Sequence, residues 1–171
     1  DMNSTQQAGL NMIQNRANNG DPTMSQATST LQQEAVRKLG FTTSRAMRVA
    51  QQLYEGVDIG SGTTGLITYM RTDSFSLANE AVISIRDYVK KNFDADYLPK
   101  SPIMYKTKAK NAQEAHEAIR PTDINRAPAK MRQFLNDEQF KLYEMIWKRT
   151  LACQMSPAKF DAVSVDLSVG T

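Results

Sequence analysis

Apolar residues recur at helical spacing in several stretches of the chain, and the first of these lies near residue 30. A helix is expected to begin at Ser29 or Thr30, since either hydroxyl can cap a first turn. It should end at Gly40, because glycine readily adopts the left-handed conformation that closes many helices. Its apolar face would consist of Leu31, Ala35, Val36 and Leu39.

A second helix should begin near Thr43 or Ser44 and end before Gly56. Helical spacing groups Met47, Ala50 and Tyr54 on one face. It groups Arg45, Arg48 and Gln52 on the opposite face. Joined through residues 40–42, the two helices resemble a helix-turn-helix, whose second helix commonly presents basic and amide groups to DNA. A solvated basic face on an ordinary helix hairpin fits the same pattern.

Two helices are expected in the middle of the chain. The first is capped by Ser76 and runs from about residue 77 to residue 92. Its apolar stripe would be formed by Ala81, Ile85, Tyr88 and Val89. The second is a short helix over residues 112–120, which Pro121 should stop because its ring disfavours helical geometry in the preceding residue.

A long helix is expected from a cap near Asn136 to a point before Pro157. Its core residues would be Phe140, Tyr143, Ile146, Trp147 and Leu151. Cys153 falls within this helical pattern, so we expect a buried thiol. Because it is the only cysteine, a disulfide within the chain and a cysteine zinc cluster are excluded.

Two stretches favour strands, and a glycine-rich segment precedes the first of them. Residues 66–69 are expected to form a short strand. Residues 163–169 alternate apolar and polar side chains, which predicts a strand with one buried face that pairs with segments outside this chain. Residues 60–65 match G-x-G-x-x-G, but they follow a helix and precede a strand, the reverse of the order in a dinucleotide site. We interpret them as a flexible turn.

The composition is that of an ordinary globular protein with a weak positive charge. The 21 Lys and Arg residues exceed the 18 acidic residues by three, which by itself is too slight to indicate an anionic partner. Two local basic patches stand out, one within residues 31–50 and one within residues 99–110. We find no signal peptide and no apolar run near the ~20 residues that span a bilayer, so we expect no membrane partner and a reducing, cytoplasmic compartment.

Tyr69 and Arg71 form the most reactive pair that the sequence suggests. Residues two apart share a face of an extended segment, so the two side chains should point the same way. A phenol with its ordinary pKa of about 10 is a poor nucleophile at neutral pH unless a nearby cation favours the phenolate. An arginine can do this and can also bind a phosphate through its planar fork. A half-buried structural pair fits the same spacing.

Several ordered motifs resemble those of type IA DNA topoisomerases. They are LITYMRTDS around Tyr69, QEAHEAIRPTD at 113–123, STLQQEA at 29–35, RAMRVAQQLYEG at 45–56, YLPKSP at 97–102 and LYEMIWKRTLACQMSPAKFD at 142–161. The resemblance covers residues 29–171. Residues 1–28 match nothing in these motifs and are either a divergent stretch or a sequence added to the natural chain.

The resemblance implies that Tyr69 cuts one DNA strand and holds its 5′-phosphate as a phosphotyrosine. Arg71 and His116 would act at the scissile phosphate, and Thr68, Thr72 and Asp73 would support the site or contact DNA. The helix-turn-helix pattern adds Arg45 and Arg48 as phosphate contacts. Glu114 and Glu117 are expected to be solvated or salt-bridged, and no metal site is assigned to this chain.

The resemblance also implies the wider reaction. The substrate would be single-stranded segments of negatively supercoiled DNA, relaxed without ATP in the bacterial nucleoid. Mg²⁺ would be bound mainly by a toprim domain that is absent here. Other domains of the same enzyme would complete the site, so the chain alone should be inactive.

The expected fold is mainly α with a few short strands. Residues 1–28 would be a polar arm, residues 29–156 a catabolite-activator-like helix-turn-helix domain bearing the tyrosine, and residues 157–171 the first strand of an adjacent arch domain, as in a piece of a longer protein. Two alternatives stay open. One is a noncatalytic winged-helix DNA-binding module that uses Lys38, Arg45 and Arg48, and the other is a structural or protein-interaction domain.

Overall fold

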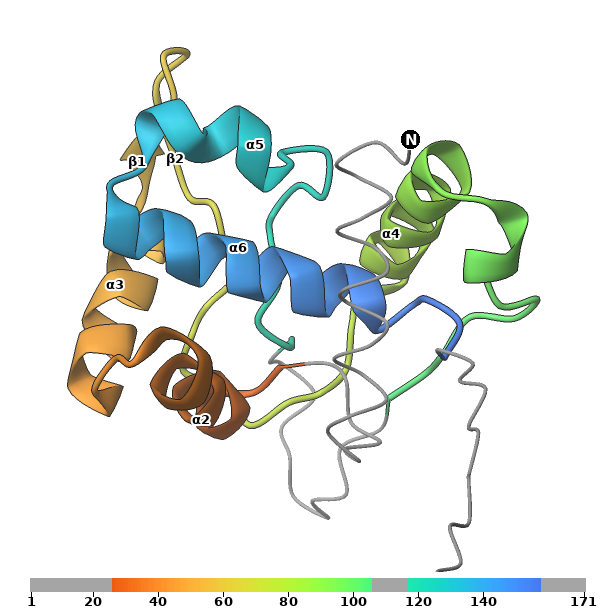
Figure 1. The fold of residues 1–171 in the computed structure, drawn as a ribbon, viewed down its shortest axis with the longest axis horizontal. Coiled ribbons are helices and arrows are strands. Elements are labelled where there is room, and N and C mark those ends of the chain that lie inside the picture. The colour runs from red at the N-terminus through yellow and green to blue at the C-terminus, as the bar shows by residue number, and fades with distance from the viewer. Residues whose placement is uncertain (1–25, 106–116, 158–171) are drawn as a thin grey trace, which may run out of the picture.

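The computed structural model describes residues 26–105 and 117–157, and these residues form a mainly helical body (Figure 1). The elements are α2 (Thr28–Leu39), α3 (Thr43–Glu55), β1 (Val57–Asp58), β2 (Thr63–Thr64), α4 (Asn79–Asn92), α5 (Pro128–Met131) and α6 (Asp137–Ala152). Single 3₁₀ turns cover Ala95–Tyr97 and Arg132–Phe134. The predicted class, helical with a few short strands, is confirmed. The predicted strand at residues 163–169 lies outside the described residues.

Helix α6 runs through the middle of the body, and α2, α3, α4 and α5 all pack against it (Figure 1). Four of its five predicted core residues, Tyr143, Ile146, Trp147 and Leu151, are buried, while Phe140 is half-buried against the core. The capping box between Asn136 and Gln139 starts the helix where the sequence predicted. Near its end Cys153 is fully buried, as expected.

Helix α2 begins earlier than predicted. Its N-cap is Ala27, and the first helical residue is Thr28, so neither Ser29 nor Thr30 caps the helix. The Thr30 hydroxyl instead sits within the first turn, where it accepts a hydrogen bond from the Ala27 amide at 2.9 Å. At the other end Gly40 has a φ of 66° and caps the helix, as predicted.

Helix α3 begins and ends as predicted, but it buries a different face. The Thr42 hydroxyl caps the helix by accepting a hydrogen bond from the Arg45 amide. The buried residues are Ala46, Val49, Ala50 and Leu53, at the i, i+3, i+4, i+7 spacing of a core-facing stripe. Tyr54, predicted on the apolar face, is 42% exposed. The buried stripe is therefore rotated away from the predicted one, and it leaves this aromatic ring at the surface.

Ser76 does not cap α4, which begins two residues later than predicted. The helix starts at Asn79 with Ala78 as its N-cap. The carboxylate of Glu117 accepts a hydrogen bond from the Ala78 amide at 2.8 Å, so a residue distant in sequence satisfies a donor at this helix end. The predicted apolar stripe of the helix is otherwise present, with Ala81, Ile85 and Val89 buried and Tyr88 against Trp147.

Two other predicted elements are absent from the described residues. Residues 66–69 form only an isolated bridge between Ile67 and Pro121, because their amides and carbonyls bond to α3 and to residues 120–122. Residues 117–120 are extended and not helical, with Ile119 bridged to Gln26. Residues 112–116 of that predicted helix lie outside the described part. The glycine-rich segment forms the turn between β1 and β2, as predicted.

Candidate DNA-cleavage site

The segment 66–74, which carries Tyr69 and Arg71, is fixed on one side by residues 118–122. The Thr68 amide donates to the Arg120 carbonyl at 2.9 Å, and the Thr68 hydroxyl donates to the Ala118 carbonyl at 2.9 Å. The same hydroxyl accepts from the Arg120 amide at 3.0 Å. The backbone just before Tyr69 is therefore pinned to a second segment, about fifty residues away in the chain.

The first turn of α2 fixes the same segment on the other side of the tyrosine. The Thr28 hydroxyl donates to the Met70 carbonyl at 2.7 Å and accepts from the Thr72 amide at 2.8 Å. The Thr28 amide in turn donates to the Thr72 carbonyl at 2.9 Å. Tyr69 and Arg71 thus stand on a short segment that is anchored both before and after them.

Exposure alternates along this segment. Tyr69, Arg71 and Asp73 are exposed, whereas the intervening Met70, Thr72 and Ser74 are buried. The alternation has the period of an extended backbone, although no partner strand pairs with it. Tyr69 and Arg71 consequently reach solvent together, and Arg71 forms no ion pair with any described residue. This side of the segment can receive a ligand.

The ring of Tyr69 lies against the ring of Tyr54 from the end of α3. The two centroids are 5.3 Å apart, the planes make an angle of 63°, and the rings are 41% and 42% exposed. These are the only two aromatic side chains among the exposed large apolar residues of the described part. The sequence did not point to this pair, since it grouped Tyr54 with the core face of α3.

The hydroxyls of Thr68 and Thr72 are occupied by the backbone of the site itself. Thr68 bonds to residues 118 and 120, and the Thr72 hydroxyl accepts from the Ser74 amide at 3.0 Å while Thr72 is buried. Both side chains hold the shape of the segment. Their role as DNA contacts stays a prediction, as does that of the exposed Asp73. His116 lies outside the described residues.

Arg45 and Arg48 both approach one carboxylate, that of Glu138 in the first turn of α6. The Nε of Arg45 donates to Glu138 at 2.8 Å and its Nη2 forms a second bond, while Arg48 approaches the other oxygen at 3.8 Å. The hydrogen bond from Arg45 holds the pKa of the Glu138 carboxyl below its usual range. The basic face that the sequence predicted is therefore partly neutralised by a residue 93 positions away from Arg45.

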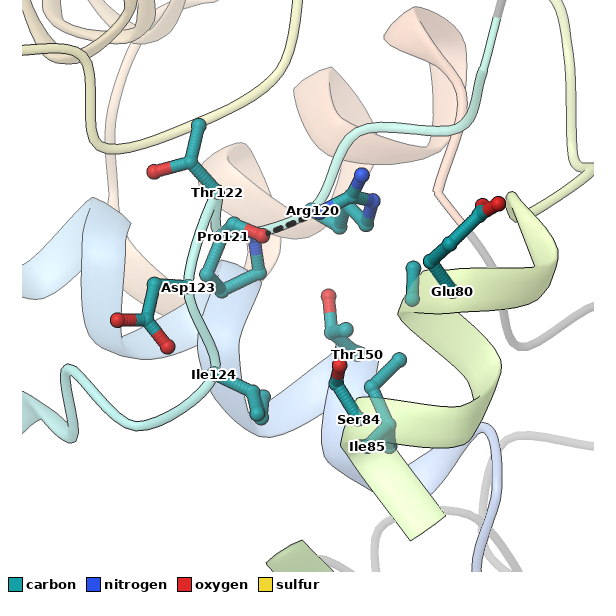
Figure 2. A pocket seen from close by; sticks show the side chains of 10 residues that line it. Glu80, Ser84, Ile85, Arg120, Pro121, Thr122, Asp123, Ile124 and Thr150 are labelled. Atoms are coloured by element: carbon teal, nitrogen blue, oxygen red, sulfur yellow. Dashed lines mark hydrogen bonds between the residues drawn. The ribbon is translucent and has the colours of Figure 1, made fainter. Parts of the chain in front are cut away.

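Arg120 lies next to the tyrosine segment and is held by several hydrogen bonds, but the sequence analysis assigned it no role. Its guanidinium binds both carboxylate oxygens of Glu117, at 2.6 and 3.0 Å, and donates to the Pro121 carbonyl. Glu117 is thus salt-bridged, as expected. Figure 2 shows Arg120 at the rim of a small pocket of about 160 Å³, into which the hydroxyls of Ser84 and Thr150 point. The only sequence signal for Arg120 was its place in the motif at 113–123.

Neither a metal cluster nor a membrane span is found in the described part of the chain. Its acidic and cysteine side chains form no group of three that could hold a metal ion. None of its helices is long and apolar enough to cross a bilayer.

Comparison with known proteins defines the class. A family model for DNA topoisomerases matches residues 1–171, including residues 1–28, which the motifs left unassigned. DNA topoisomerase 1 of Rickettsia bellii is 57% identical over 141 residues, covering 82% of this chain and 18% of that protein. DNA topoisomerase 1 of Xylella fastidiosa is 54% identical over 144 residues, covering 84% of this chain and 18% of that protein.

A solved structure gives the same result. Full-length topoisomerase I from Thermotoga maritima matches with a TM-score of 0.66 and 46% identity, over 77% of this chain and 20% of that one. The chain therefore belongs to the DNA topoisomerase family. The relatives are bacterial topoisomerase I proteins, so the resemblance read from the motifs is confirmed, and the chain spans about a fifth of their length.

Proposed function

We propose that this chain supplies the nucleophile of a bacterial type IA topoisomerase, an enzyme that breaks one DNA strand, passes another strand and reseals the break. The observation that carries the proposal is the position of Tyr69. In a chain of this family, its ring reaches solvent beside Arg71 on a segment anchored at Thr28 and at Arg120. A nucleophile must be accessible and held in place, and this segment meets both conditions.

The proposed chemistry is a reversible exchange of phosphodiester bonds. The Tyr69 oxygen attacks the phosphorus, its bond to phosphorus forms, and the bond from phosphorus to the 3′ oxygen of the preceding nucleotide breaks. The phenol gives up its proton and the leaving 3′ oxygen gains one. Arg71 would stabilise the negative charge that develops on the phosphate. One phosphodiester replaces another, so resealing needs no ATP.

The other parts of the proposal concern the metal ion, the substrate, the place of action and residues outside the described part. We propose that Mg²⁺ is held mainly by another domain of the intact enzyme, and we derive no step through it. We also propose single-stranded segments of negatively supercoiled DNA as the substrate, with action in the cytoplasm at the nucleoid. His116 would join Arg71 at the phosphate, and residues 157–171 would begin the arch domain.

A covalent trapping experiment tests the proposal. The full-length protein is mixed with a labelled single-stranded oligonucleotide, denatured rapidly and digested with protease. The labelled peptide should contain Tyr69, joined to the 5′-phosphate of the cut strand. A covalent link to another residue would overturn the assignment. Salt-dependent binding without any covalent product would favour the alternative of a noncatalytic DNA-binding module.

The Glu138 carboxylate should weaken DNA binding by occupying Arg45 and Arg48. If these arginines contact phosphates, they must first give up Glu138, so Glu138→Gln should tighten binding about threefold at low salt. It should also steepen the slope of log affinity against log salt concentration, by up to about one released counterion. Titration of the full-length protein with a single-stranded oligonucleotide at several salt concentrations measures both effects.

Glu144→Gln is the matched control for this prediction. It removes the same charge from the same helix, but its carboxylate binds Lys148, at 2.9 Å, instead of the two arginines. An equal gain in affinity for both variants would mean that the change in net charge alone causes the effect. An unchanged salt slope in Glu138→Gln would argue against Arg45 and Arg48 as phosphate contacts.

A further inference from the structure

Tyr54 makes a contact with Tyr69 that the proposed reaction does not by itself require. The two rings meet edge to face with centroids 5.3 Å apart. No described residue accepts or donates a hydrogen bond at the Tyr54 hydroxyl, so the ring alone makes the interaction. Edge-to-face contacts of this kind shift a conformational population by roughly two- to tenfold.

The backbone beneath the two rings is fixed, so their separation is set by the fold. The Leu66 amide donates to the Leu53 carbonyl at 2.7 Å, and both leucine side chains are fully buried. The neighbouring pair, Gly65 and Tyr54, leaves no room for a side chain, since a Cβ on Gly65 would lie only 2.7 Å from the Tyr54 carbonyl oxygen. Glycine permits this close approach. The segment that leads to Tyr69 therefore passes the end of α3 directly beside Tyr54.

The exposure of Tyr69 explains why its ring needs a neighbour. A surface tyrosine can occupy several staggered rotamers about its Cα–Cβ bond, and only one of them presents the phenolic oxygen to a given phosphate. The Tyr69 residue is 41% exposed, so the core does not enclose its ring completely. The ring of Tyr54, held by α3, contacts the Tyr69 ring.

We propose that Tyr54 is a positioning residue that holds the ring of Tyr69 in its attacking orientation before DNA is cut. This inference rests on the proposed function of Tyr69. Stacking of a DNA base on the exposed ring of Tyr54 is the rival interpretation, and it gives a different result in the experiment below.

Tyr54→Leu in the full-length protein tests the inference. Single-turnover cleavage of a single-stranded oligonucleotide at saturating protein should slow by about five- to tenfold, while the dissociation constant for the oligonucleotide changes less than about twofold. Tyr54→Phe should cleave at the unsubstituted rate because it keeps the ring. Tyr54→Met, which has another side-chain shape, should repeat the loss seen with leucine.

Resealing gives a readout that a general structural defect would not imitate. In the cleaved state the bond to DNA fixes the Tyr69 ring, so the resealing rate should stay the same in Tyr54→Leu. The ratio of cleaved to intact DNA at equilibrium should then fall by the same factor as the forward rate. Tyr97→Leu is the control, because its ring contacts Phe93 at 5.9 Å elsewhere in the fold. It should leave both rates unchanged.

Three outcomes would overturn the inference. The first is cleavage by Tyr54→Leu and Tyr54→Met at the unsubstituted rate. The second is weaker binding with a normal rate at saturation, which would make Tyr54 a base-stacking residue. The third is an equal loss in Tyr54→Phe, which would assign the effect to the hydroxyl. None of these results bears on whether Tyr69 is the nucleophile, which covalent trapping decides separately.

Discussion

Tyr69→Phe in the full-length protein should abolish DNA cleavage and relaxation while leaving noncovalent DNA binding nearly intact. The substitution removes only the phenolic oxygen, which is the atom that would bond to phosphorus. It keeps the ring and therefore its contact with Tyr54. Gel assays of supercoil relaxation and of oligonucleotide cleavage measure the loss, and a binding titration measures what remains.

Tyr54→Phe is a matched control for this prediction, because it is the same substitution in the neighbouring ring. Full activity in Tyr54→Phe together with none in Tyr69→Phe would assign the chemistry to a single oxygen. Relaxation by Tyr69→Phe at a rate near that of the unsubstituted protein would refute the assignment of the nucleophile.

Arg71→Lys should slow cleavage by about 10²-fold with little change in DNA affinity. Lysine keeps the positive charge but loses the planar fork that can bind two phosphate oxygens at once. The size of the loss is that of removing one donor to charge that develops in the transition state. Single-turnover cleavage at saturating protein isolates this step from binding. Since Arg71 forms no ion pair with a described residue, the substitution should leave the fold undisturbed.

The double variant Arg45→Ala with Arg48→Ala should behave in the opposite way. It should weaken binding and flatten its salt dependence, with normal cleavage once DNA is saturating. Normal cleavage by Arg71→Lys at saturation would mean that Arg71 only tethers the phosphate. A loss of affinity and salt slope in Arg71→Lys, matching the double variant, would have the same meaning.

Local signals in the sequence were sufficient for the helices that begin at strong caps. Thr42 starts α3 and the capping box of Asn136 starts α6, both where the sequence predicted. The sequence-based prediction failed where a distant residue supplies the partner. Glu117 takes the Ala78 amide and so moves the start of α4 past Ser76. Leu53 takes the Leu66 amide, so an apolar run that looks like a strand has no strand beside it.

The candidate site also has a part that the sequence could predict and a part that it could not. Tyr69 and Arg71 could be named from their motif, and their shared exposure follows the predicted period of two. The contact of Tyr54 with Tyr69 could not be predicted, because it depends on how closely Gly65 approaches α3. The ion pair of Glu138 with Arg45 could not be predicted either, because the two residues are 93 positions apart and only the fold brings them together.

The two hydrogen bonds of the Thr28 hydroxyl have a consequence for movement. If Tyr69 is the nucleophile, as proposed, it holds one end of the cut strand and has to travel when a gap opens in that strand. Because Thr28 bonds to the backbone on both sides of Arg71, residues 70–72 cannot shift relative to α2 without breaking these bonds. The tyrosine segment should therefore move with α2 and α3 as one rigid unit. Any hinge that opens the gap then lies outside residues 28–72.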